Sequence, residues 1–541
     1  MPLPGRRAAV VLITIAAVAA TVVTAWPASA DSLDRSDHAQ ARNGGLLLSR
    51  TVYTASPDSI TAGQTQLPAG CTSSCVTAVA DGSYPEVFNN ESADPSFGVS
   101  SPIYLDQLTA DGRTVNTLAV PGSGGDHRHG ADHLVTSFPS KSELALNLST
   151  DGSAVTFMGY VAPVDAPDVS NSNTPGIVDP TNPVGVAYYR AVAQLNPDGR
   201  LRYTETNAYS GNNGRAAILN SADNVYYTAG NAGNGSTPQP AGVIEGAGAQ
   251  LLHPTRAPQA AQHPGTPTPV GSFSITQLGD PADKVGKDTN FRGLTIFSNV
   301  VYLSKGSGGN GVNTVYFIDT TGHTCPGGVG VPVPGAALPT TPISYDPATV
   351  QSNGLPPNMC ILQGFPTALK SKTSFPFGLW FANPTTLYVA DEGNADTAYD
   401  PATNTYTAAA GQTTAGLQKW VLTNGTWTRA YTLTAGLDLG RPYTVPGYPT
   451  GTNPTTSLPW SPATDGLRNI TGRVNRDGAV SIWAITSTVS GATDTGADPN
   501  RLVSITDRPA ATSRGQTSFA TVRTARTREA LRGITLNPAD H

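Results

Sequence analysis

The chain has 541 residues, including 57 Gly and 45 Pro, and only 13% of its residues are charged. Its 32 Lys and Arg nearly balance 38 Asp and Glu, which gives a net charge of -6. These values describe a turn-rich, weakly charged globular protein, and they exclude the strongly basic surface that is typical of nucleic-acid binding.

The N-terminus has the pattern of a secretory signal peptide over residues 1–30. Arg6-Arg7 precede a long apolar run, and Ala28-Ser29-Ala30 matches a small-x-small cleavage site. An uncleaved anchor is the alternative, because the apolar run approaches membrane-spanning length. We therefore expect a secreted, extracellular protein without a membrane span after cleavage. A disordered polar segment at 31–43 and one folded domain at 44–541 would follow.

Four cysteines in an exported protein predict two disulfide bonds. Cys71 and Cys75 lie in one short loop, and Cys325 and Cys360 bracket a segment rich in Pro and Gly. Four cysteines allow three connectivities, of which local pairing within each couple is the simplest. A metal or redox role for the CxxxC couple is the less favoured alternative.

From residue 44 onward the apolar runs are short, rich in Val, Ile, Tyr, Phe and Thr, and bounded by Gly, Asn, Asp or Pro. This pattern predicts an all-β protein. The clearest unit is a strand around Phe377–Phe381, a turn at Asn383-Pro384, a second strand at Leu387–Ala390 and an acidic loop that begins at Asp391.

The first strand of this unit recurs along the chain. The related segments begin at Glu143, Arg215, Arg292, Phe377, Arg468 and Arg532. A second strand follows each of them except the last, and third and fourth strands come after it, as at the Asn424-Gly425 hairpin. Four antiparallel strands per repeat make the blade of a β-propeller, so we expect a single propeller of about six blades, with seven as the alternative.

The last repeat contains only one strand, at Arg532–Leu536. Three further strands are expected near the N-terminus, at Leu46–Tyr53, Ile103–Gln107 and Val115–Val120. One blade shared between the two chain ends would close the ring and leave no free sheet edge.

Runs such as Leu387-Tyr388-Val389-Ala390-Asp391 make the chain resemble secreted propellers of the NHL, lactonase and gluconolactonase-like kind. The resemblance covers most of the mature chain. It lies in the sequence pattern of the blades, and no catalytic motif is shared. It implies that the first strands line a central channel. It also implies that the loops entering them share one face with the loops that join second and third strands.

Four arginines would then surround one mouth of the channel: Arg215, Arg292, Arg468 and Arg532. Guanidinium groups bind carboxylates and phosphates in a bidentate manner, so one interpretation is a site for an anionic ligand. The other is that each arginine pairs with a neighbouring carbonyl or acid and fastens one blade to the next. The loops that begin at Asn231 and Lys305 are rich in Gly and would add ligand contacts on this face.

Asp391 and Glu392 are the best acid/base candidates of the chain, although adjacent carboxylates can point apart. A hydrolase that uses two carboxyl groups needs them about 5–10 Å apart, and the partner could be Asp396, Asp465 or Glu143. The alternatives are a solvated loop or a set of Ca²⁺ ligands, because carboxylate and carbonyl oxygens suit that ion.

One histidine-rich segment runs from Asp126 to His133. Asp126, His127 and His133 could bind Zn²⁺ or Cu²⁺, and His129 could act as a base. The spacing matches no standard zinc motif, so a solvated polar loop is the favoured alternative.

The remaining conspicuous side chains are aromatic residues within strands, which we expect to pack between blades. They are Tyr226, Tyr302, Trp380, Tyr388 and Trp483. The chain lacks the GxSxG motif that positions a nucleophilic serine, so the sequence does not predict catalysis of the Ser-His-Asp type.

Three functions fit this pattern. The first is a secreted propeller that binds an anionic saccharide at the channel mouth and cleaves it as a hydrolase or lyase. The second is a non-catalytic binding or cell-envelope interaction protein, and the third is a Ca²⁺-dependent lactone or ester hydrolase. We expect a monomer with a small-molecule or glycan ligand and no nucleic acid. The sequence does not fix a cofactor; Ca²⁺ or another divalent metal is the candidate.

Overall fold

The computed structural model describes residues 45–538 with several internal gaps. The gaps are 55–59, 62, 68–75, 78–98, 121–132, 138–141, 167–187, 207, 210–212, 232–247, 255–258, 262–267, 272–289, 307–311, 323–324, 326–327, 334–335, 342–358, 369–373, 455 and 493–494. The predicted signal peptide and polar N-terminus lie outside the described residues.

Strands dominate the described residues, as the sequence predicts. In this part of the chain they are accompanied by a four-residue helix, α3 (Thr407–Ala410), and a 3-10 turn, η2 (Thr495–Ala497). None of the helices in the described ranges is long and apolar enough to cross a lipid bilayer.

Four sheets follow one another from residue 214 to residue 524. The first contains β11 (Gly214–Asn220), β12 (Val225–Gly230), β13 (Ala249–Leu252) and β15 (Thr268–Gly271). The second contains β16 (Leu294–Phe297), β17 (Val300–Lys305), β18 (Thr314–Ile318), β20 (Met359–Leu362) and β19 (Val329–Gly330). The third contains β21 (Pro376–Asn383), β22 (Thr386–Asp391), β25 (Gly416–Thr423) and β26 (Thr426–Leu433). The fourth contains β27 (Ala463–Val474), β28 (Val480–Val489), β29 (Arg501–Asp507) and β30 (Ala520–Thr524).

The N-terminal part of the chain forms a ten-stranded sheet that includes the last strand. One half contains β31 (Glu529–Leu536), β1 (Leu46–Val52), β4 (Ser100–Leu108) and β5 (Thr114–Ala119). The other half contains β7 (Asn147–Leu148), β8 (Val155–Ala162), β9 (Arg190–Leu195), β10 (Leu201–Thr206) and β14 (Gln259–Ala261). Two small hairpins lie outside these sheets: β2 (Gln66–Leu67) with β3 (Val76–Thr77), and β23 (Tyr399–Asp400) with β24 (Thr405–Tyr406).

Strand β6 (His133–Ser137) joins the two halves, and the sequence did not predict it. It lies where we expected a loop leading to Glu143. Its residues pair with Ser100–Pro102 of β4 and with Tyr160–Ala162 of β8. The stretch of β4 lies beyond the part that pairs with β1, and the stretch of β8 lies beyond the part that pairs with β7. Strand β6 supplies the backbone hydrogen-bond partners of both stretches.

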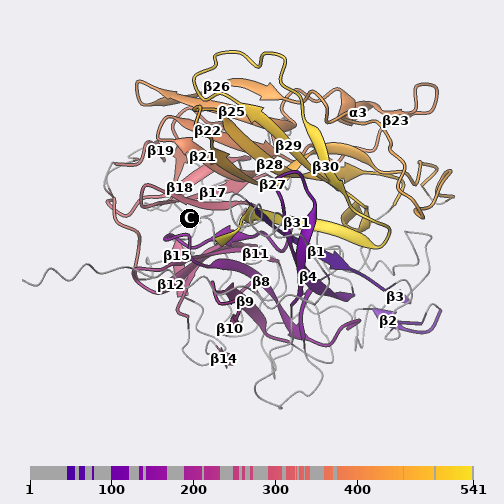
Figure 1. Cartoon of the computed structure of the whole chain (residues 1–541), viewed down its shortest axis with the longest axis horizontal. Helices are drawn as coiled ribbons and strands as arrows, with labels where there is room; N and C mark the ends of the chain where they lie inside the picture. Colours follow the sequence, from indigo (N-terminus) through magenta and orange to yellow (C-terminus); the bar gives the residue numbers. More distant parts are fainter. Residues whose placement is uncertain are drawn as a thin grey trace, which may run out of the picture.

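The first strands of the sheets lie side by side and surround one axis. We call β31, β7, β11, β16, β21 and β27 the inner strands; each contacts the next in this order, and β27 contacts β31. In Figure 1 the yellow β31 crosses the middle of the molecule, with β21–β30 above it and β8–β12 below it. The described chain is therefore an all-β, propeller-like ring of sheets.

The turns follow the sequence signals. Asn424 and Gly425, with φ of 50° and 75°, join β25 to β26, and this confirms the predicted hairpin. Both residues adopt the left-handed conformation that a two-residue type I′ turn requires. Ser298 and Asn299 do the same between β16 and β17, with φ of 48° and 60°.

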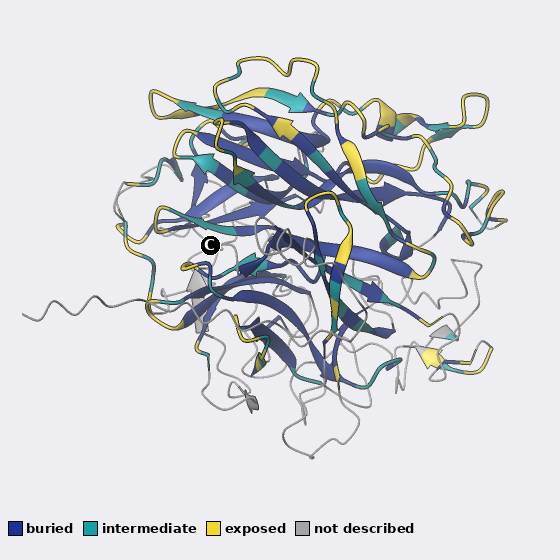
Figure 2. Cartoon of the chain, in the orientation of Figure 1, coloured by how far each residue is buried: buried dark blue, intermediate teal, exposed yellow. Residues whose placement is uncertain are grey.

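The core lies between neighbouring sheets, and Figure 2 shows exposed residues mainly in loops and in outer strands such as β26 and β30. Phe297 of β16 stacks on Phe381 of β21 with ring centroids 4.6 Å apart, and Phe365 stacks on Trp420 at 3.9 Å. Among the aromatic residues predicted to pack between blades, Tyr226, Tyr302, Tyr388 and Trp483 are buried, and Trp380 is half-buried.

Cys325 and Cys360 form the predicted disulfide bond. Cys360 lies in β20, so the bond ties the loop that contains Cys325 to the outer part of its sheet. The second predicted couple, Cys71 and Cys75, lies outside the described residues.

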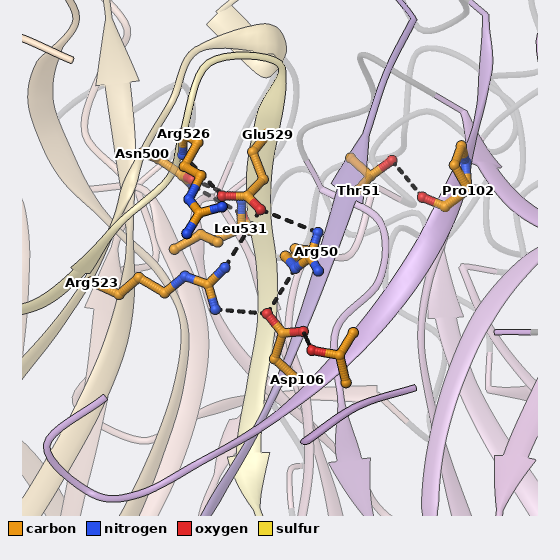
Figure 3. Close-up of polar contacts among 10 residues, drawn as sticks. Arg50, Thr51, Pro102, Asp106, Asn500, Arg523, Arg526, Glu529 and Leu531 are labelled. Atoms are coloured by element: carbon orange, nitrogen blue, oxygen red, sulfur yellow. Dashed lines mark hydrogen bonds and ion pairs between the residues drawn. The ribbon is translucent and has the colours of Figure 1, made fainter. Parts of the chain in front are cut away.

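The two ends of the chain meet in a group of four charged residues, two buried acids and two half-buried arginines, which we call the terminal ion-pair cluster (Figure 3). Arg50 Nε lies 2.7 Å and Arg523 Nη1 2.6 Å from Asp106 Oδ2. The same two guanidinium groups lie 3.1 Å and 3.4 Å from Glu529 Oε1. The cluster connects β1, β4 and β31 to β30 of the neighbouring sheet.

Candidate functional site

All four predicted arginines lie in the first half of an inner strand or just before one. Arg215, Arg468 and Arg532 belong to β11, β27 and β31, and Arg292 precedes β16 by two residues. Each is buried, with between 2% and 8% of its surface exposed. We call this end of the inner strands the arginine end.

Glu392 connects two of these arginines from different sheets. Its Oε2 atom accepts a hydrogen bond from Arg468 Nε at 3.1 Å, and its Oε1 atom lies 3.8 Å from Arg292 Nε. Its backbone carbonyl also accepts a hydrogen bond from Ser487 of β28. The absence of a side chain at Gly466 permits this close approach, because a Cβ atom there would lie 2.3 Å from the Asp391 carbonyl oxygen.

Asp391, the other predicted acid, is buried within its own loop. Its Oδ2 atom accepts hydrogen bonds from Ser374, Gln418 and the amide of Phe375, and its Oδ1 atom accepts one from the amide of Gly393. Burial raises the pKa of Asp391 to about 6 although these hydrogen bonds lower it. Its four donors give this carboxyl group a clear role in holding the loop.

Asp465 of β27 is the more unusual carboxyl group. Its two oxygens accept hydrogen bonds from the Ala395 amide at 2.8 Å and from Gln412 Nε2 at 2.6 Å. Burial raises the pKa of Asp465 to about 7, with a further contribution from the charge of Glu392. Asp465 therefore titrates near neutral pH beside Glu392. Asp396, the other suggested partner on this loop, is exposed.

The third suggested partner, Glu143, lies in a second group at the same end. It accepts hydrogen bonds from Tyr160, from Thr136 Oγ1 and from the Ser137 amide, and it forms an ion pair with Arg190 at 3.4 Å. The Arg190 guanidinium lies 4.4 Å above the ring of Tyr160. The sequence analysis missed Arg190 and Tyr160, although an arginine at the start of an apolar strand is a signal that could have found Arg190.

Arg215 lies between the two groups and contacts two neighbouring sheets. Its Nε atom donates to Ser142 Oγ at 2.7 Å, and its Nη1 atom donates to the Phe291 carbonyl oxygen at 2.7 Å. Burial, and then the charge of Arg292, lower the pKa of Arg215 well below its usual value. Arg532 Nη2 donates to the Gly496 carbonyl oxygen at 3.1 Å. The interpretation of the arginines as fasteners between sheets thus has direct support in these contacts.

The other predicted ligand-binding residues, Lys305 and Asn231, lie at or just after the ends of second strands. Lys305 is buried at the end of β17, where Nζ donates to Asn313 Oδ1 at 3.4 Å. Asn231 is half-buried, and its amide donates to the carbonyl oxygen of Asn213.

The histidine hypothesis stays a prediction. His133 is exposed at the start of β6, while Asp126, His127 and His129 lie outside the described residues. Within the described ranges, the one group with the spacing of a metal site consists of Asp319, Cys325 and Cys360. Its cysteines are bonded to each other, so they are not available as thiolate ligands.

The charge at the arginine end depends on pH. Four buried guanidinium groups of the described chain act on one another there, those of Arg190, Arg215, Arg292 and Arg468. The buried carboxyl groups around them are those of Glu143, Asp391, Glu392, Asp465 and Asp498. Because the pKa values of Asp391, Asp465 and Asp498 are raised to about 6, about 7 and about 7, the local charge becomes more positive as the pH falls through this range.

Comparison with known proteins gives distant structural similarity only. No protein-family model matches the chain, and no curated protein matches it either. Among solved structures it is similar to an ulvan lyase of a new polysaccharide lyase family, with 11% identity, a TM-score of 0.30 and coverage of 90% of this chain and 95% of the lyase. It is also similar to the N-terminal domain of Nup159, with 9% identity, a TM-score of 0.24 and coverage of 73% and 89%.

A third similar structure is NanB with Optactamide, with 10% identity and a TM-score of 0.17; the match covers 79% of this chain and 47% of NanB. Similarities at these scores do not indicate what the chain binds or does. The narrower resemblance to NHL, lactonase and gluconolactonase-like propellers stays a prediction.

Proposed function

We propose that this chain is a secreted β-propeller that binds an anionic saccharide, one with a uronate-type carboxylate, at the arginine end of its channel. One observation carries the proposal: Arg292 and Arg468, from two different sheets, hold the single carboxylate of Glu392 between them. The same kind of charged hydrogen bond would hold the carboxylate of a ligand. When Asp391, Asp465 and Asp498 take up protons below neutral pH, the buried guanidinium groups leave an excess of positive charge, which is costly unless an anion compensates it.

We further infer that the ring has six blades and is closed where β31 pairs with β1. The contacts between consecutive inner strands support this count, as does one cavity that all six inner strands line. The shared blade would hold the arginine end in a fixed geometry, which a carboxylate site built from several sheets requires.

The binding proposal is tested with the mature protein and two matched ligand sets, oligogalacturonates and the neutral galacto-oligosaccharides of the same length. Calorimetry at pH 6 should detect the acidic ligands, with an affinity that decreases as salt is added. The Arg468→Gln variant should lose at least tenfold in affinity, because about 1.4 kcal/mol corresponds to a factor of ten and charged hydrogen bonds contribute about that much or more.

Arg200→Gln is the matched control, because Arg200 is an arginine on the surface with 85% of its side chain exposed. It should bind like the wild type. Thermal unfolding of both variants shows whether Arg468→Gln is folded. A folded Arg468→Gln protein with wild-type affinity would refute the proposal, and binding of the neutral set alone would do the same.

The catalytic part of the proposal rests on Asp465. A carboxyl group with a pKa of about 7 can exchange a proton near neutral pH, which general acid–base catalysis requires. Product analysis of the same ligand mixtures, by ultraviolet absorbance for elimination and by new reducing ends for hydrolysis, distinguishes cleavage from binding alone.

A further inference from the structure

The inner strands also enclose a cavity of about 380 Å³, beyond the arginine end along their direction. Its lining begins at Ile470 of β27 and Ile534 of β31, each two residues after an arginine. With a rise of about 3.3 Å per residue, this places the lining about 7 Å further along each strand. The cavity is large enough for a small ligand, since such sites start at about 300 Å³.

The cavity lining differs in chemistry from the arginine end. None of its lining residues, all of which belong to the described chain, carries an ionisable side chain. Hydroxyl and amide groups come from several inner strands and from the β16–β17 turn: Asn147, Thr295, Ser298, Asn299, Thr471 and Thr535. Uncharged donors and acceptors on several sides suit a ligand with many hydroxyl groups and no charge.

One of these groups is a buried donor that needs a partner. Asn147 lies in β7, and its Nδ2 atom is inaccessible to solvent and has no hydrogen-bond partner among the described residues. A buried amide without a partner costs free energy, so a native structure with such a group calls for an explanation. A rotation of the amide about the Cβ–Cγ bond would turn this donor toward the cavity, where an acceptor from a bound ligand would satisfy it.

Two aromatic rings complete the lining and are held rigidly. Trp380 packs against Gly472 of the neighbouring sheet, where a Cβ atom would lie 2.6 Å from the indole ring. Phe297 is half-buried and stacks on Phe381, so one of its faces is fixed. Aromatic rings combined with neutral hydrogen-bonding groups match the apolar C–H and polar O–H groups of a sugar ring.

We propose that this cavity is a second binding site, which takes a neutral sugar ring such as a hexose or the end of a neutral oligosaccharide. Once its amide has turned toward the cavity, Asn147 donates to a sugar hydroxyl oxygen. The threonine and asparagine side chains supply further hydrogen bonds, and Phe297 and Trp380 contact the carbon face. The site does not depend on the arginine end, because its lining contains no charge.

The test uses the mature protein with glucose, galactose, mannose, xylose and their β-linked disaccharides, measured by saturation-transfer NMR and calorimetry. At least one of these neutral sugars should bind to the wild type. Asn147→Leu removes the amide at nearly constant volume and should weaken that binding at least tenfold. Its melting temperature should equal or exceed that of the wild type, because the variant no longer buries an amide without a partner.

Two controls separate this site from the arginine end. Arg468→Gln should keep the affinity for the neutral sugar, and Asn116→Leu, in the outer strand β5, should bind like the wild type. If none of these sugars binds, or if folded Asn147→Leu binds them as the wild type does, the proposal is wrong and the cavity holds only water. Loss of neutral-sugar binding in Arg468→Gln would also overturn it, because the two sites would then be one.

Discussion

At the residue scale, the buried carboxyl group of Asp465 should make the stability of the protein depend on pH. Burial raises its pKa from 3.8 to about 7 in the folded state. Between these two values the native state binds more protons than the unfolded state, so the free energy of unfolding decreases as the pH rises. A difference of this size corresponds to about 4 kcal/mol at most.

Asp465→Asn removes this titration and should therefore be more stable than the wild type at pH 8, while the difference disappears near pH 4. Melting temperatures measured from pH 4 to pH 8 give the comparison. Asp198→Asn, at an exposed position, is the control for the loss of one carboxylate. A wild type and Asp465→Asn with parallel profiles over this range would show that Asp465 does not titrate there.

The sequence predicted which arginines lie in the first half of the inner strands or just before them, but not their partners. Arg215, Arg292 and Arg468 could be found because each begins a repeated strand pattern. Their hydrogen-bond acceptors come from neighbouring sheets, such as Glu392 for Arg468 and the Phe291 carbonyl for Arg215. Such contacts depend on how the sheets pack, which the local pattern does not encode.

At the scale of elements, the terminal ion-pair cluster should stabilise the contact between β30 and the strands β1, β4 and β31. Asp106 has 1% of its side chain exposed and pairs with Arg50 and Arg523. Burial alone would raise its pKa, but hydrogen bonding to Arg50 and the charge of Arg50 lower it overall. Asp106→Asn leaves two half-buried guanidinium groups with less compensation and should destabilise the protein by about 2 kcal/mol, between the values for exposed and fully buried ion pairs.

The matched control is Asp477→Asn, which removes a carboxylate that also pairs with an arginine. Asp477 lies 3.3 Å from Arg508, but its side chain is 59% exposed. Exposed pairs contribute about 0–1 kcal/mol, so this variant should unfold close to the wild type in urea. Equal destabilisation by the two variants would contradict the assigned role of the cluster.

Most strands could be predicted because alternating apolar residues and Gly, Asn or Pro turns mark them locally. Strand β6 could not, because its partners are the protruding ends of β4 and β8, which are far apart in sequence. The inner strand after Glu143 is also shorter than predicted, since only Asn147–Leu148 forms β7. The pairing of the last strand with the first was predictable, because one repeat lacked its partners.

At the scale of the whole molecule, the proposed closure through β1 and β31 should make the ring unfold as one unit. Leu47 and Leu48 of β1 pair with Thr535 and Ile534 of β31, so the two chain ends complete one sheet. A sheet that holds both ends leaves no free inner edge from which unfolding could start. Amides of β1 and β31 should therefore exchange with solvent as slowly as those of β21 and β27.

Hydrogen exchange followed by mass spectrometry measures this directly, since exchange through global unfolding gives all four strands the same protection. Thr535→Pro removes the backbone donor of β31 that faces Leu47 of β1, and it should lower the protection of all four strands together if the ring shares its stability. If β1 and β31 exchange much faster than β21 and β27 in the wild type, the chain ends open separately and the ring is not closed by this pairing. The arginine end would then have a movable side, because Arg532 lies on the strand that opens.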